Sequence, residues 1–255
     1  MKFAVISYQR TGSTFFVSKL NTIQGVVCHS ELFNNGFHSF ENSIFDPELF
    51  LELSLFDKLT GRSQAEKLFK FKNKEPLRFL HHIFSYRDEP TGFKIFPGQN
   101  KSVLHHILKD RSVKKIVLIR ENLVRSFISR EIALKTGEWG KYNKNDVSLV
   151  KISMDVDRFL DYADSVKGRF KQIESILTDS EQPYLKCTYE QISKRFPLEE
   201  VCSFLNIPKP DQLPEIDQVR QNPFILSEMI INFKDVKRRL DGTGYSRFLE
   251  DSDKE

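Results

Sequence analysis

The residues best suited to chemistry lie near the start of the chain, where Arg10, Thr11, Gly12, Ser13 and Thr14 follow a short apolar run. An amphipathic segment comes next, so we expect the order strand, small-residue turn, helix. Backbone N–H groups of such a turn and of the first helical turn point into one hollow, where the helix dipole favours negative charge. The hydroxyls add donors, and the arginine adds a planar cation suited to a phosphate or sulfate. The pattern predicts an anion-binding loop, with a polar turn that binds nothing as the alternative.

This loop differs from a Walker A loop, which reads G-x-x-x-x-G-K-[ST] and uses its lysine to reach the β- and γ-phosphates. Aligned on Gly12, the chain has Ser7 in place of the first glycine and Ser13 in place of the lysine. Only Thr14 fits the last position, and the cation has moved to Arg10. The departure argues against an ordinary ATP-driven kinase.

Two further candidates belong to other predicted strands. Glu31 comes just after a short apolar run at 25–28, and Lys94 lies within the run 92–97. Open α/β sheets bind ligands beyond the carboxyl ends of their strands, which favours a place for Glu31 near the loop. A lysine on a buried strand is costly unless it meets an anion. The alternatives are a capping or solvated Glu31 and an edge strand with Lys94 in water.

The run 114–119 is the clearest buried strand, because it is almost continuously apolar. It ends in Arg120, whereas a Walker B strand ends in an acidic magnesium ligand. Ser129 follows two turns into the next predicted helix. Arg120 and Ser129 could grip a second phosphate, although such a pair also occurs widely without a ligand.

Composition limits the classes of function. A net charge of +4 in 255 residues fits an acidic ligand without requiring nucleic acid. Cys28, Cys187 and Cys202 lack metal or disulfide spacing, so we expect no metal and a reducing, cytoplasmic compartment. No apolar run approaches the ~20 residues that span a bilayer, and no signal-peptide pattern precedes the first strand.

The order of elements predicts an α/β protein: a three-layer, P-loop-type fold with a central parallel sheet flanked by helices. We interpret residues 1–255 as a single domain. Residues 34–90 read as a helical insert that covers the site, with phenylalanines lining an acceptor pocket or, for most of them, packing in the core. Residues 224–240 read as a helix, and a glycine turn follows at 242–247, within a C-terminal part at 224–255.

Several of these segments together resemble sulfotransferases that use 3′-phosphoadenosine 5′-phosphosulfate (PAPS). The loop at 9–14 resembles their 5′-phosphosulfate loop, and its R-T-G-S-T form is similar to the bacterial Stf0-like branch. Arg120 with Ser129 resembles the family's 3′-phosphate motif. The segment 29–33 resembles the one that carries the branch's glutamate base. Residues 92–94 and 186–190, the latter with Tyr189, resemble later strands of the family.

The resemblance implies metal-independent transfer of a sulfuryl group from PAPS to a hydroxyl or amine, with release of 3′-phosphoadenosine 5′-phosphate (PAP). It implies three catalytic residues, Glu31 as base with Arg10 and Lys94 as cations. It also implies nucleotide contacts from Arg10, Thr11, Gly12, Ser13, Thr14, Arg120, Ser129 and Tyr189. Phe96 stands where cytosolic animal and plant enzymes carry a histidine, so Glu31 becomes the base candidate.

The acceptor suggested by the resemblance is a small molecule such as a bacterial secondary metabolite, with a saccharide or glycolipid as the alternative. We expect no nucleic-acid partner and a possible homodimer. Two other functions stay open: a P-loop kinase of small metabolites, and a non-catalytic nucleotide-binding protein that kept the loop.

Overall fold

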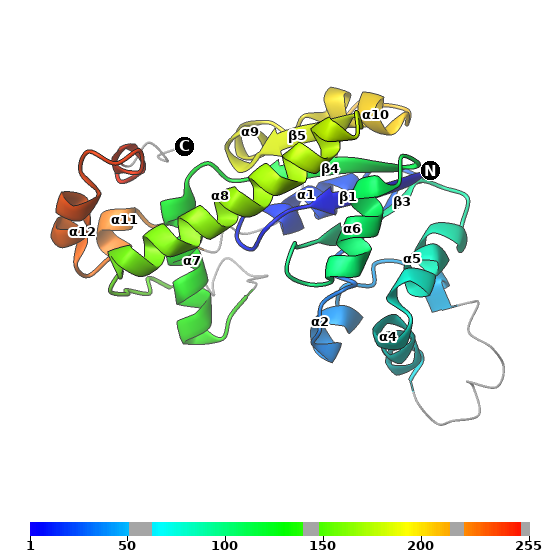
Figure 1. Ribbon diagram of the computed structural model, residues 1–255, viewed down its shortest axis with the longest axis horizontal. Coiled ribbons are helices and arrows are strands. Elements are labelled where there is room, and N and C mark those ends of the chain that lie inside the picture. The colour runs from blue at the N-terminus through cyan, green and yellow to red at the C-terminus, as the bar shows by residue number, and fades with distance from the viewer. Residues whose placement is uncertain (51–62, 140–147, 215–221, 251–255) are drawn as a thin grey trace. The chain divides into compact units, whose positions relative to one another are not determined.

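A computed structural model describes residues 1–50, 63–139, 148–214 and 222–250 of the chain (Figure 1). The strands are β1 (Lys2–Ile6), β2 (Val27–His29), β3 (Thr91–Ile95), β4 (Val113–Ile119) and β5 (Tyr184–Thr188). The helices are α1 (Ser13–Leu20), α2 (Phe37–Glu41), α4 (Gln64–Lys74), α5 (Pro76–Ser85), α6 (Lys101–Lys109), α7 (Leu123–Thr136), α8 (Val156–Asp179), α9 (Tyr189–Lys194), α10 (Leu198–Leu205), α11 (Leu226–Met229) and α12 (Phe233–Leu240). Two short 3-10 helices are η1 (Pro47–Phe50) and η3 (Ser246–Phe248).

The chain divides into two compact units, each of which is described by itself. Unit 1 consists of Met1–Tyr8, Gly12–Ile119 and Gln172–Glu215, and unit 2 consists of Gln9–Thr11, Arg120–Lys171 and Ile216–Glu255. The five strands belong to unit 1, and α7, α11 and α12 belong to unit 2. The interpretation of residues 1–255 as one domain stays a prediction.

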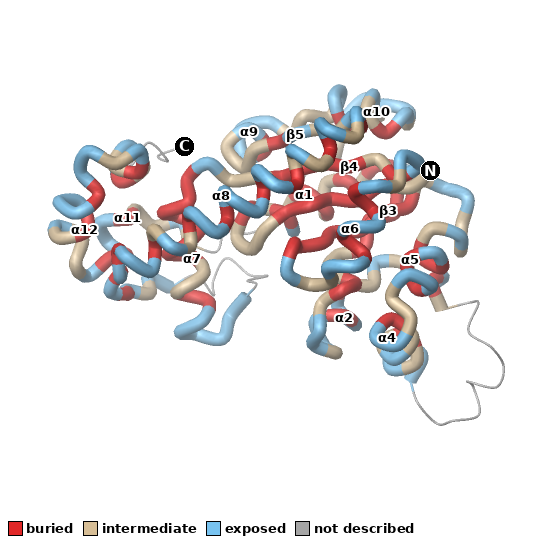
Figure 2. Tube along the Cα trace, in the orientation of Figure 1, coloured by how far each residue is buried: buried red, intermediate tan, exposed pale blue. Residues whose placement is uncertain are grey.

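The sheet of unit 1 has the order β2-β3-β1-β4-β5, and its paired strands are parallel. Both faces are covered, because Phe3 and Val5 are fully buried among α1 and α10 while Ala4 and Ile6, which point to the opposite face, are fully buried too. Figure 2 shows β3 as buried tube, whereas β5 at the edge of the sheet is only partly buried. The observed architecture confirms the predicted α/β class with a central parallel sheet flanked by helices.

The sheet has a topological switch point at the carboxyl ends of β1 and β3. These strands are neighbours, but the chain leaves β1 toward β2 at one edge and leaves β3 toward β4 on the far side of β1. Open α/β sheets bind ligands at such a point. The loop after β1 and the turn after β3 are therefore the places where unit 1 would hold a ligand.

The described parts of the 34–90 insert are mainly helical, as predicted, and comprise α2, η1, α4 and α5. Rings from this insert pack on one another: Phe79 contacts both Phe33 and Phe40, and all three are buried in the core. Core packing is therefore their observed role. Residues 51–62 of the predicted helical insert lie outside the described residues.

The prediction of one helix over 224–240 was wrong, because two helices are separated by a break at residues 230–232. Ile230 forms an isolated parallel bridge with Ile152, and the backbone N–H of Ile231 donates to the Ile152 carbonyl at 2.9 Å. The Asn232 side chain bonds both the N–H and the carbonyl of Met154. These long-range partners satisfy groups that a continuous helix would have paired internally.

Replacing Gly92 by alanine is expected to destabilise the protein by about 1–3 kcal/mol. Gly92 pairs with Phe3 in the sheet, and a Cβ there would come within 2.4 Å of the buried Phe3 ring. Urea unfolding followed by circular dichroism measures the effect.

The matched control is Gly168→Ala on α8, where an added Cβ meets nothing within 4 Å. Alanine is the better helix former, so this variant should gain about 0.5–1 kcal/mol. Equal stability of Gly92→Ala and the wild type would contradict the observed packing.

Candidate active site

The loop after β1 has an unusual backbone. Arg10 and Gly12 both adopt left-handed conformations, with φ of 64° and 75°, on either side of Thr11. Such an alternation turns successive N–H groups toward one side and makes an anion-binding nest. Gly12 is also the N-cap of α1. Because glycine has no side chain, it provides no capping acceptor to the first N–H groups of that helix. The local backbone thus has the form predicted for an anion loop.

Unit 2 holds Arg10 in its strained conformation through the Arg10 carbonyl. Arg120 Nη1 donates to this oxygen at 3.0 Å, and Ser126 Oγ donates to it at 3.3 Å. A left-handed non-glycine residue costs about 1–2 kcal/mol, and such strain persists only where the surroundings hold it in place. Arg120 therefore supports the loop before any ligand binds.

The Arg10 side chain bonds Ser129, the residue that the sequence analysis paired with Arg120 as a second phosphate site. Arg10 Nε donates to Ser129 Oγ at 2.8 Å, and Arg10 Nη1 donates to the carbonyl of Trp139 at 3.0 Å. Asn222 Nδ2 also donates to Ser129 Oγ, at 3.0 Å. Unit 2 thus brings Arg10, Arg120 and Ser129 together, and adds Asn222, which the sequence analysis missed.

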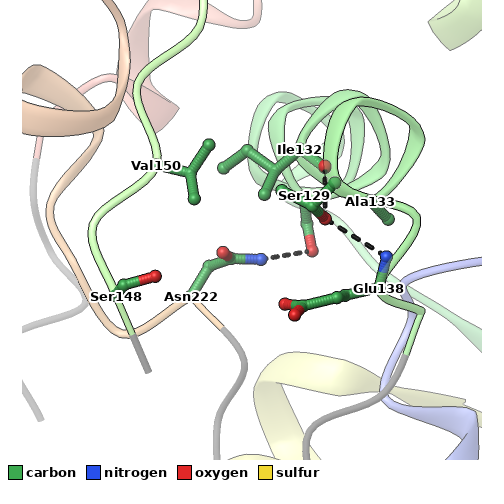
Figure 3. A pocket seen from close by; sticks show the side chains of 8 residues that line it. Ser129, Ile132, Ala133, Glu138, Ser148, Val150 and Asn222 are labelled. Carbon is green, nitrogen blue, oxygen red and sulfur yellow. Dashed lines mark hydrogen bonds between the residues drawn. The ribbon is translucent and has the colours of Figure 1, made fainter. Parts of the chain in front are cut away.

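A small pocket of unit 2 borders this group. Figure 3 shows the Asn222 amide directed at Ser129, with Glu138 at the same pocket. The Glu138 carboxylate disfavours an anion on its own side.

In unit 1 the two remaining catalytic candidates form an ion pair. Lys94 Nζ lies 3.1 Å from Glu31 Oε1, and only 2% of the lysine side chain is exposed against 23% for Glu31. The same ammonium donates to Thr14 Oγ1, at 3.3 Å, in the first turn of α1. β3 is an interior strand, so the alternative of an edge strand with Lys94 in water was wrong. The anion that Lys94 meets is Glu31.

The second oxygen of Glu31 has donors that the sequence analysis missed. Oε2 accepts from Gln99 Nε2 at 2.7 Å and from Asn34 Nδ2 at 3.2 Å. Gln99 lies in the turn after β3, so the rule that drew attention to Glu31, a polar residue just beyond a strand's carboxyl end, could have found it. Asn222 has no such signal, because it lies 93 positions from Ser129.

The remaining nucleotide-binding candidates differ in burial and in what they contact. Thr11 and Ser13 are buried, whereas Thr14 is exposed. Tyr189, the first residue of α9, lies against Gly12 so closely that a Cβ on the glycine would be 2.4 Å from its ring. Tyr189 therefore braces the loop, and its predicted contact with the nucleotide stays a prediction.

His29, at the end of β2, is a neutral and weakly basic neighbour of this site. Burial lowers its pKa to about 3, with Arg87 acting in the same direction and Asp46 opposing. Its Nδ1 accepts from the Phe45 N–H at 3.1 Å, so Nε2 carries the proton and faces Tyr86 Oη. A ring with this pKa is a poor proton acceptor at neutral pH, which leaves Glu31 as the base candidate.

Among the described residues, no group of three or more His, Cys, Asp and Glu side chains is arranged to hold a metal ion. No helix in the described part of the chain is long and apolar enough to cross a membrane.

No protein-family model matches the chain, and no curated protein matches it. A solved structure described as "Sulfotransferase Domain from the Curacin Biosynthetic Pathway" is similar to it, with a TM-score of 0.47 and 14% sequence identity. The similarity covers 89% of this chain and 82% of that one. A likeness at this level carries no argument about chemistry, which has to come from the residues.

We predict that His29 makes the fold sensitive to acid. The folded state cannot protonate this ring until about pH 3, whereas the unfolded state does so near pH 6.5. The unfolded state binds more protons between these values, so the free energy of unfolding falls as the pH drops, by roughly 5 kcal/mol across the whole window. Urea unfolding at pH 7, 6 and 5 measures the slope.

The variant His29→Gln is expected to flatten this slope, and His81→Gln, an exposed position on α5, is expected to leave it unchanged. Identical slopes in His29→Gln and the wild type would show that other groups cause the acid sensitivity.

Proposed function

We propose that the chain is a sulfotransferase that moves a sulfuryl group from PAPS to a hydroxyl or amine of a small-molecule acceptor and releases PAP. One observation carries the proposal. Lys94, buried on β3, touches both Glu31 and Thr14, and so joins a carboxylate to the first turn of the helix that follows the anion loop. A base, a cation and an anion-binding helix start are the parts that this transfer needs.

Each unit has donors that suit one anionic group of PAPS. In unit 2, Arg10, Arg120 and Ser129 supply two guanidinium groups and a hydroxyl, which suit a phosphate monoester such as the 3′-phosphate. In unit 1, Thr14, Lys94 and the first N–H groups of α1 suit a sulfated 5′-phosphate. Thr11, Gly12 and Ser13 contribute backbone N–H groups.

The bond from Arg10 to Ser129 supports a first role for Arg10 at the proposed 3′-phosphate. Its expected help to the leaving 5′-phosphate is a second proposed role. PAPS supplies the sulfuryl group, and its 3′-phosphate is what Arg120 and Ser129 use to distinguish it from ATP.

Glu31 takes the proton of the acceptor as the acceptor oxygen or nitrogen bonds to sulfur. The S–O bond to the 5′-phosphate breaks at the same time, and its electron pair leaves with PAP. Lys94 stabilises the charge that grows on this leaving oxygen more than it stabilises the ground state. General base catalysis of this kind is worth roughly 10²–10⁴-fold.

We place the enzyme in the bacterial Stf0-like branch and in the cytoplasm, with a small metabolite as acceptor. A saccharide or glycolipid is the alternative acceptor.

Incubation with ³⁵S-labelled PAPS and a metabolite extract should yield labelled products that mass spectrometry finds heavier by one sulfuryl group. Glu31→Gln should abolish turnover and leave PAP affinity nearly intact, because the base acts only in the chemical step. The control Glu41→Gln changes an exposed carboxylate on α2 and should keep full turnover.

PAP binding without any labelled product would favour a non-catalytic nucleotide-binding protein. Turnover that depends on ATP and magnesium would instead favour the kinase alternative. A fully active Glu31→Gln variant would remove Glu31 as the base.

Arg120→Ala is expected to weaken PAP binding about 10- to 100-fold and to change the binding of adenosine 5′-phosphate much less. The fluorescence of Trp139, the one tryptophan of the sequence, can report binding because its carbonyl holds Arg10. The control Arg111→Ala removes an exposed arginine bonded to the Ser180 carbonyl and should leave both affinities unchanged. Equal losses for the two nucleotides would exclude Arg120 from the 3′-phosphate.

A further inference from the structure

The two carboxylate oxygens of Glu31 accept different numbers of hydrogen bonds. A carboxylate offers about four lone-pair sites, two on each oxygen. Oε2 accepts from Gln99 at 2.7 Å and from Asn34 at 3.2 Å. Oε1 pairs with Lys94 at 3.1 Å. Within the described part of the chain, both sites of Oε2 are therefore occupied, while Oε1 keeps capacity for one more partner.

Gln99 is itself held from both ends of the turn after β3. Its backbone N–H donates to the Phe96 carbonyl at 3.0 Å, and its side-chain oxygen accepts from the Phe96 N–H at 3.0 Å. A backbone N–H can only donate, so this bond identifies the amide oxygen and directs the Nε2 group at Glu31. Gln99 is thus a pre-organised donor rather than a surface side chain that happens to reach the carboxylate.

We propose that Gln99 is a positioning residue that fixes Glu31 through Oε2 and so makes Oε1 the oxygen that takes the acceptor's proton. The inference rests on the proposed function, since it needs Glu31 as the base. Oε1 is the oxygen beside Lys94, whose ammonium also bonds Thr14 at the start of α1. The proton is therefore taken up next to the cation that receives the leaving group's charge, and no rotation of the carboxylate is needed during the step.

The first test needs no turnover. Protein labelled with ¹³C in its glutamate side chains is titrated by NMR, and the Glu31 carboxyl signal is assigned by its loss in Glu31→Gln. In Gln99→Leu, which removes the donor at similar volume, the midpoint of the Glu31 titration should move up by about one pH unit, because the charged form has lost a hydrogen bond.

The matched control is Asn100→Ala. Asn100 adjoins Gln99 and caps α6 by accepting from the Val103 N–H, so its loss weakens the same turn without touching Glu31. Its titration midpoint should equal that of the wild type. An unchanged midpoint in Gln99→Leu, or an equal shift in Asn100→Ala, overturns the proposal.

If Gln99→Leu does not fold, Gln99→Glu serves in its place. This variant keeps an acceptor for the Phe96 N–H and sets a second carboxyl against Oε2, so the pair should share a proton and the Glu31 midpoint should rise further than in Gln99→Leu. An unmoved midpoint here overturns the proposal as well.

The second test uses the acceptor fraction that the labelled PAPS assay identifies. Gln99→Leu should lower kcat about 10- to 100-fold at unchanged KM for PAPS, and the acid limb of its pH–rate profile should move with the NMR midpoint. A wild-type protein without transferase activity refutes the proposed function while the NMR result stands. Transfer in the wild type together with an unshifted Gln99→Leu profile refutes only the role of Gln99.

Discussion

The buried ion pair between Lys94 and Glu31 is the constraint on which the site of unit 1 depends. Lys94 belongs to β3, which has β1 on one side and β2 on the other, and its side chain is almost completely buried. An ammonium in such a place costs several kcal/mol unless a partner offsets the cost, and removing one member of a buried pair typically costs 3–5 kcal/mol. The Glu31 carboxylate therefore offsets part of the cost of burying Lys94.

This ion pair connects three segments that the proposed transfer needs together. Lys94 comes from β3, Glu31 comes from the segment after β2, and Thr14 comes from the first turn of α1. All three meet at the carboxyl edge of the sheet, beside the switch point between β1 and β3. Stability and the proposed reactivity thus depend on the same contacts, because Lys94 neutralises Glu31 and also bonds Thr14 at the predicted anion loop.

Residues of unit 2 hold Arg10 in a strained, left-handed conformation. Arg10 is left-handed, and its carbonyl is fastened by Arg120 and Ser126 while its side chain is fastened by Ser129. The residues proposed to bind an anion are therefore the same residues that impose the backbone which exposes the loop's N–H groups. Strain of this kind is typical of sites that are organised before the ligand arrives.

The strands and their parallel arrangement followed from the sequence alone, and the anion loop stays a prediction from it. A strand buried on both faces must be almost continuously apolar, as 114–119 is, and a turn with Arg10 and Gly12 between a strand and a helix is typical of an anion loop. Only the tertiary structure decided that 224–240 is broken at Asn232, that Gln99 holds Glu31 across 68 positions and that Asn222 reaches Ser129 across 93. The physical reason is that periodicity reports which face of an element is buried, whereas a single polar side chain has no period, and its partner exists only after the chain has folded.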